Sequence, residues 1–135
     1  MLRIANRSQS MGTKQKPTGI KRIYLAAGHS LRAFKWLIAN EAAFKQEFWL
    51  SVLLVVGCLF FPFSLFEYVF LWCALLFVLL AEIFNTAIEA VVDRIGAEIH
   101  PLSGLAKDLG SLAVMVSVII ATLIWAGVFI QHLSL

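Results

Sequence analysis

Charged residues are scarce in this sequence. They make up 14% of its 135 residues, whereas 61% are hydrophobic, and the mean hydropathy is +0.87. So few charges cannot solvate the surface of a water-soluble domain of this size, and that class is excluded. The composition predicts a small, polytopic, all-α membrane protein.

Familiar motifs of soluble enzymes are also absent. The chain has no GxxxxGK[ST] phosphate loop, no GxSxG and no HExxH, and no Cys/His pair has metal-ligand spacing. Its two cysteines, Cys58 and Cys73, fall inside apolar segments, so we expect packing residues rather than a disulfide. Any nucleotide would therefore have to be held by scattered side chains and a metal ion.

Segments without charge predict three transmembrane helices. The runs 48–66 and 109–130 are long enough to cross about 30 Å of hydrocarbon as helices, whereas the run 68–81 can span only together with its flanks. We expect spans at about residues 42–63, 66–94 and 105–131, with the second extending into the cytoplasm.

Basic residues are concentrated near the amino terminus. Residues 1–45 hold nine of the eleven Lys and Arg and one acid, Glu41, while the turn 62–67 has no base. The positive-inside rule then predicts a multi-pass protein with a cytoplasmic amino terminus. Residues 1–18 are polar and basic without an apolar core, which predicts a disordered tail rather than a signal peptide, followed by a membrane domain over residues 19–135.

A different pattern precedes the first predicted span. Apolar residues recur there at steps of three and four between bases, which predicts an amphipathic helix in the membrane surface over about residues 19–38. It could be a simple anchor or could also attract anionic groups. We expect Gly28 to Ser30 to interrupt it and Asn40 to cap the first span.

An acidic row leaves the second apolar segment. Glu82, Asn85, Glu89 and Asp93 lie within roughly 80° of one another on a helix. An ionised acid at bilayer depth costs about 2.5 to 3.5 kcal/mol, so a row of them needs a cation, a partner or water. The row is a candidate site. The alternative is that these residues mark the cytoplasmic interface, where acids cost little.

Further polar residues are expected at the same membrane level. Glu41 and Glu89 could share a divalent cation whose shell a phosphate-bearing ligand completes. Lys107 is a candidate phosphate partner, and the glycine- and proline-containing loop before it should fold back so that Glu89 and Lys107 meet. Taken singly, each could instead be a helix-end charge or half of a surface ion pair. The others in this group are Glu47, Glu98, His100 and Asp108.

Three segments carry a family resemblance: NEAAFKQE, AEIFNTAIEAVVDRIG and LSGLAKDLGS, in this order. From about Gly19 to about His132 the chain resembles the prokaryotic integral membrane diacylglycerol kinases. The resemblance implies a homotrimer of three-helix subunits in the bacterial inner membrane, each with a surface helix and with active sites shared between subunits. It implies transfer of the γ-phosphate of ATP, with Mg²⁺, to diacylglycerol, yielding phosphatidate, and no nucleic-acid partner.

The resemblance also assigns roles to residues. Glu82 would be the general base, with Asn85 beside it, and Glu41 and Glu89 would hold the metal on the nucleotide. Matched nucleotide positions also include Arg22, His29, Glu98, His100, Lys107 and Asp108; matched lipid positions are Ala43, Phe44, Gln46, Glu47, Glu82 and Ser111. His29 and Leu105 depart from the tyrosine-like phenol and the arginine expected at those places.

Two other functions fit parts of the sequence. A sister branch that resembles the same fold phosphorylates undecaprenol, although NEAAFKQE is more similar to the diacylglycerol branch. A small oligomeric channel lined by the acidic row is the alternative from another class. The centres of the three predicted spans are nearly free of polar groups, which argues against a pore.

Overall fold

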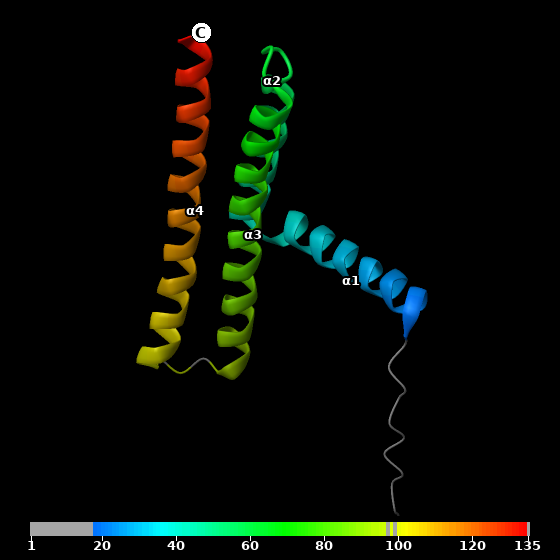
Figure 1. The fold of residues 1–135 in the computed structure, drawn as a ribbon. Helices are drawn as coiled ribbons and strands as arrows, with labels where there is room; N and C mark the ends of the chain where they lie inside the picture. The colour runs from blue at the N-terminus through cyan, green and yellow to red at the C-terminus, as the bar shows by residue number, and fades with distance from the viewer. Residues whose placement is uncertain (1–17, 97, 99, 135) are drawn as a thin grey trace, which may run out of the picture. The chain divides into compact units, whose positions relative to one another are not determined.

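The computed structural model describes residues 18–96, 98 and 100–134. Helices are the only regular elements in these residues, which confirms the all-α prediction. They are α1 (Gly19–Asn40), α2 (Ala42–Cys58), α3 (Leu65–Ile95) and α4 (Pro101–Leu133) (Figure 1). The chain divides between Lys35 and Trp36 into two units, which are described separately. The predicted tail over residues 1–18 lies, except for Thr18, outside the described residues.

The helix α1 runs without interruption through Gly28 to Ser30, so the expected break there is wrong. The Ser30 hydroxyl donates to the Ala26 carbonyl at 3.1 Å, inside the helix, and one glycine costs a helix only about 1 kcal/mol. The expected cap is also wrong. Glu41, not Asn40, is the N-cap of α2, because Asn40 still belongs to α1 and Glu41 has the extended backbone that precedes a helix. The Asn40 side-chain amide donates backwards to the Trp36 carbonyl at 2.8 Å.

The helix α2 ends at Cys58, earlier than the limit near residue 63 that the apolar run predicts. Its 17 residues measure about 25 Å, at the short end of what a span needs. Turn hydrogen bonds follow directly, and Pro62 cannot continue a helix. Hydropathy did not mark this end because Leu59 to Phe61 remain apolar in the turn.

A capping box begins α3. The Ser64 N–H donates to the Glu67 carboxylate at 2.6 Å, and the Glu67 N–H donates to the Ser64 hydroxyl at 3.4 Å. From there α3 continues as one helix through the whole acidic row. By length and composition, α3 and α4 are the helices among the described residues that could cross a membrane.

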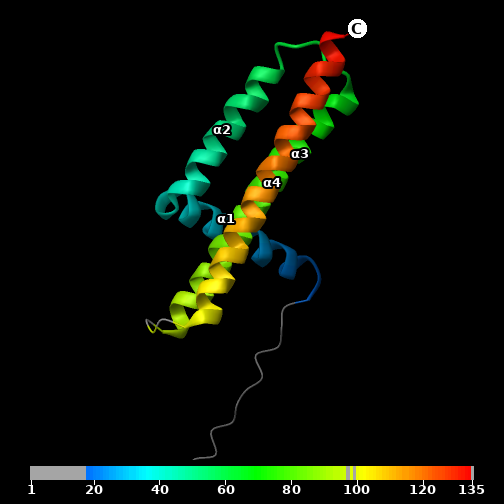
Figure 2. The ribbon, with the colours of Figure 1, turned by 90° about the vertical axis from the view of Figure 1, so that its left-hand side faces the viewer.

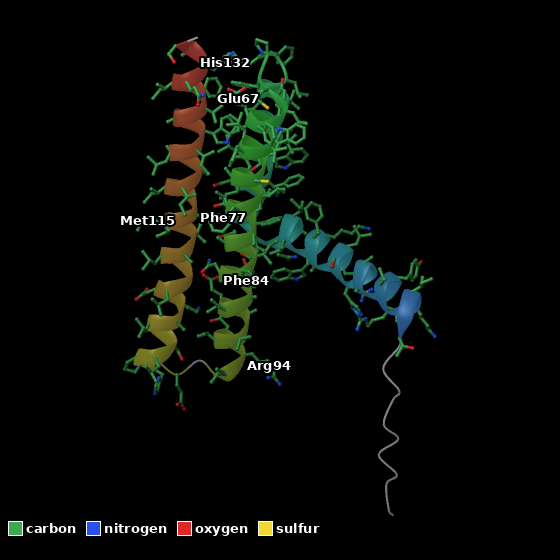
Figure 3. All side chains as sticks on the ribbon, viewed as in Figure 1. Glu67, Phe77, Phe84, Arg94, Met115 and His132 are labelled. Atoms are coloured by element: carbon green, nitrogen blue, oxygen red, sulfur yellow. The ribbon has the colours of Figure 1, made fainter. Side chains whose placement is uncertain are left out.

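In the second unit α2 packs on α3, and α3 packs on α4 (Figure 2). Small buried residues, Ala74 on α3 and Ala121 on α4, allow the helices to approach closely, and the Trp125 indole donates to the Leu71 carbonyl at 3.2 Å. Glu67 and His132 lie together at one end of the α3/α4 pair, and Arg94 lies at the other (Figure 3). The antiparallel hairpin therefore sets the acidic end of α3 beside the start of α4.

Candidate functional site

The acidic row of α3 passes from the protein interior to its surface. Glu82 and Asn85 are buried, with only 4% and 8% of their surface exposed, Glu89 is half-buried, and Asp93 is exposed. The residues lie one helical turn apart, as the spacing predicts. Glu82 is therefore shielded from bulk water, while a ligand can reach it from the side of the more accessible Glu89.

Asn85 links the members of this row. Its Nδ2 donates to Glu89 Oε1 at 3.3 Å, and it also interacts with the Glu82 carboxylate. Its Oδ1 is buried and has no hydrogen-bond partner among the described residues; instead it lies against Gly110 of α4. The amide therefore presents its donor side to the carboxylates.

Four carboxylates from α2 and α3 are close enough for their like charges to interact. Glu82 interacts with Glu41, Glu89 and Glu47, and one carboxylate oxygen of Glu47 is buried without a hydrogen bond to any described residue. Repulsion of this kind is relieved by a proton or by a bound cation. The fold thus places the start of α2 against the row on α3, which the sequence alone did not specify.

Lys107 supplies positive charge at the same end of the hairpin. Its Nζ lies 2.6 Å from Asp93 Oδ1, and its charge also interacts electrostatically with Glu89 at longer range. The loop folds back as predicted, but the direct partner of Lys107 is Asp93 and not Glu89. Both side chains are well exposed, at 41% and 66%, so this ion pair contributes little stability and can be exchanged for another anion.

The predicted metal pair has the donor chemistry for Mg²⁺. No group of three or more His, Cys, Asp or Glu within the described ranges could by itself hold a metal ion. Magnesium, however, usually takes one or two protein carboxylates and completes its shell with phosphate oxygens and water. Glu41 and Glu89, which both interact electrostatically with Glu82, supply the two carboxylates that such a half-shell needs.

The other predicted nucleotide residues belong to three further parts of the chain. Glu98 and His100 line a hollow of about 570 Å³ with Ser103 where α3 passes to α4, and His100 Nδ1 accepts from the Leu102 N–H at the start of α4. Asp108 is exposed on α4. Arg22 and His29 belong to the first unit, where both are exposed and the His29 ring contacts the Arg32 guanidinium.

The predicted lipid residues have mixed positions. Ala43 and Gln46 are exposed, and Gln46 lines a hollow of about 180 Å³ with Glu41. Phe44 is buried at 1% exposure, so its ring lies in the protein interior, whereas Ser111 is exposed on α4. The sequence did not distinguish the inward from the outward positions at the start of α2, because the face of α2 that packs on α3 is decided only in the tertiary structure.

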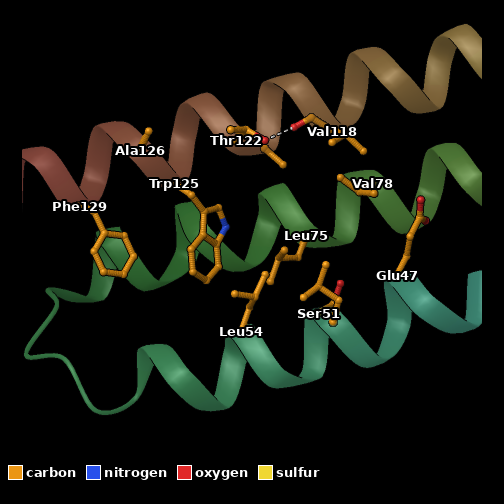
Figure 4. Close-up of a pocket in the computed structure, with 12 residues that line it drawn as sticks. Glu47, Ser51, Leu54, Leu75, Val78, Val118, Thr122, Trp125, Ala126 and Phe129 are labelled. Atoms are coloured by element: carbon orange, nitrogen blue, oxygen red, sulfur yellow. Dashed lines mark hydrogen bonds between the residues drawn. The ribbon is translucent and has the colours of Figure 1, made fainter.

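An apolar cavity of about 460 Å³ begins at Glu47. It is lined by residues of α2, α3 and α4, with Glu47 and Phe129 at opposite ends and Trp125 between them (Figure 4). The Thr122 hydroxyl at its wall donates to the Val118 carbonyl at 2.8 Å. A cavity with one carboxylate at the end of an apolar wall suits an amphiphile with a small polar head.

Sequence reasoning missed two contacts. One is the pairing of Asp93 with Lys107; the other is the approach of Gly110 to Asn85. A glycine inside a long apolar helix is a general signal for close helix packing, so Gly110 could have been singled out. That Gly110 contacts Asn85 could not have been predicted, because the sequence of neither helix alone determines the register in which α4 packs on α3.

Comparisons with known proteins give a consistent result. A family model described as prokaryotic diacylglycerol kinase matches residues 28–129. A diacylglycerol kinase of Escherichia coli (strain K12) is 44% identical over 115 residues, covering 85% of this chain and 94% of the relative. A diacylglycerol kinase of Pseudomonas aeruginosa is 41% identical over 113 residues, covering 84% and 92%, respectively. One from Haemophilus influenzae is 36% identical over 113 residues, covering 84% and 96%.

Proposed function

Because the chain belongs to the prokaryotic diacylglycerol kinase family, it is a diacylglycerol kinase, and we propose that it transfers the γ-phosphate of ATP to the free hydroxyl of diacylglycerol. The products are phosphatidate and ADP. The observation that supports this chemistry best is the buried Glu82, joined through Asn85 to Glu89 and surrounded by further acids. Phosphoryl transfer depends mainly on positioning and on charge neutralisation, and this group of side chains can provide both.

In the proposed reaction Glu82 accepts the proton of the lipid hydroxyl. The hydroxyl oxygen attacks the γ-phosphorus, a new P–O bond forms, and the bond to the β-phosphate oxygen breaks. Asn85 holds the neighbouring carboxylates in place. Lys107 leaves Asp93 for the γ-phosphate, where its charge stabilises the charge that develops during transfer.

Glu41 and Glu89 are proposed to hold Mg²⁺ with the nucleotide phosphates. These two half-buried carboxylates would hold the ion, which would supply neutralisation of the phosphate charge. Arg22, His29, Glu98, His100 and Asp108 are proposed nucleotide contacts. Ala43, Phe44, Gln46, Glu47 and Ser111 are proposed around the lipid.

The finer architecture is also part of the proposal. Three spans, formed by α2, α3 and α4, with α1 as a surface helix, would place the acidic end of α3 at the cytoplasmic face of the inner membrane. The lengths of α3 and α4 and the basic residues of the first 45 positions support this arrangement. We propose a homotrimer, in which a neighbouring subunit would complete each site.

The function is tested by offering purified protein labelled ATP and a panel of lipid alcohols in mixed micelles. We expect phosphatidate from diacylglycerol at a rate well above that of undecaprenyl phosphate from undecaprenol. In liposomes the protein should conduct no ions above lipid alone. Preferred labelling of undecaprenol would shift the acceptor to the sister branch, and ion flux without any lipid phosphorylation would favour a channel.

The metal role is tested by Glu41→Ala and Glu89→Ala. Each should raise the Mg²⁺ concentration that half-activates the enzyme by about tenfold or more, because each removes a carboxylate ligand from a cation that relies on few of them. The measurement is a Mg²⁺ titration at saturating ATP and diacylglycerol. Glu67→Ala, in the first turn of α3 and without a proposed role in the site, is the control. If neither Glu41→Ala nor Glu89→Ala changed the activation midpoint, the assignment of these two residues as Mg²⁺ ligands would be refuted.

A further inference from the structure

Gly110 is a point of close approach between α4 and the acidic row. It is buried, and a Cβ built on it would clash with Asn85 Oδ1, at a separation shorter than real Cβ contacts show. The same Cβ would lie 3.4 Å from Asn85 Cγ and 3.5 Å from Asn85 Cα. The backbone of α3 could therefore accommodate a methyl group at ordinary contact distance, and only the Asn85 amide oxygen would have to move.

The orientation of this amide matters because its two ends differ chemically. Nδ2 is a donor and faces Glu89 Oε1 at 3.3 Å, with Glu82 also in reach, whereas Oδ1 is an acceptor. Turned around, the amide would set Oδ1 against two carboxylates and would lose the bond to Glu89. The buried Oδ1 has no hydrogen-bond partner among the described residues. No donor holds it in place, and it fits there because Gly110 has no side chain.

We propose that Gly110 is a positioning residue for phosphoryl transfer: because it has no side chain, it leaves the room in which the Asn85 amide can lie with its donor side toward Glu82 and Glu89. This inference rests on the proposed function insofar as it concerns turnover. The orientation of the amide itself is independent of the substrate.

The test compares Gly110→Ala with Gly127→Ala. Both add one methyl group to α4, but a Cβ at Gly127 meets no described atom within 4 Å. We expect Gly110→Ala to fold with a thermal midpoint close to that of the wild type and to lower kcat by about ten- to a hundredfold, as misplacement of catalytic groups does, with little change in KM for ATP. Gly127→Ala should retain wild-type kinetics.

A spectroscopic measurement keeps the inference testable apart from activity. The sequence has three asparagines, Asn6, Asn40 and Asn85, so ¹⁵N-asparagine labelling yields few side-chain amide signals, and Asn85→Ala identifies the one that matters. In Gly110→Ala the Asn85 side-chain signals should shift, and in Gly127→Ala they should not. Unshifted Asn85 signals, or a kcat for Gly110→Ala within twofold of the wild type, would overturn the proposal. A wild-type protein inactive on diacylglycerol would instead refute the proposed function, and the amide signals would still decide the role of Gly110.

Discussion

Replacing Glu82 with glutamine is expected to lower the kcat for phosphatidate formation by at least about a hundredfold. Glutamine keeps the shape of the side chain and much of its hydrogen bonding but cannot accept the hydroxyl proton. Because Glu82 is buried beside other acids, removing its charge also relieves repulsion, so the protein should fold at least as stably as the wild type. Turnover is measured with saturating ATP and diacylglycerol, and folding by thermal unfolding and by size in detergent.

Glu67→Gln is the matched control for this experiment. Glu67 lies on the same helix, near its opposite end, where it forms the capping box of α3 with Ser64. Its Oε1 lies 3.9 Å from Nδ1 of His132. Its replacement should cost some stability and leave kcat nearly unchanged. Near-normal turnover in a correctly assembled Glu82→Gln protein would show that another group accepts the proton.

The second large effect is expected for Lys107→Ala, which should lose about a hundredfold in diacylglycerol phosphorylation. The ammonium group is a positive charge held at the end of the α3/α4 hairpin, and its exposed pairing with Asp93 leaves it free to bind the γ-phosphate. Lys107→Arg should retain part of the activity, limited by geometry, because a planar guanidinium replaces a compact point charge. Initial rates over a range of ATP concentrations separate the loss in kcat from the loss in nucleotide affinity.

Asp93→Asn distinguishes the charge of Lys107 from its ion pair. This variant breaks the same contact but leaves the ammonium in place, so it should lose much less activity than Lys107→Ala. Equal losses in the two variants would mean that the ion pair, by joining α3 to α4, is what the reaction needs. In that case Lys107 would be a structural residue rather than a phosphate partner.

Local patterns in the sequence were sufficient where a single helix decides the outcome. The spacing of Glu82, Asn85 and Glu89 placed them on one face of α3, and the structure keeps them there. Local rules failed at helix ends: Gly28 did not break α1, and α2 ended at Cys58 although the apolar run continues. Hydropathy measures the preference for lipid, whereas a helix end depends on turn hydrogen bonds and on capping residues such as Ser64.

The sequence by itself determined the class of the protein, the all-α fold, the family and the residues of the acidic row. These follow from composition, helical period and motif order, which are properties of neighbouring residues along the chain. Only the tertiary structure decided which side chains from different helices meet: Lys107 with Asp93, Glu47 with Glu82, and Gly110 with Asn85. The physical reason is that an apolar helix can pack in many registers of similar hydrophobic energy, and the register is selected by the close fit of small residues, such as glycine, against one particular partner.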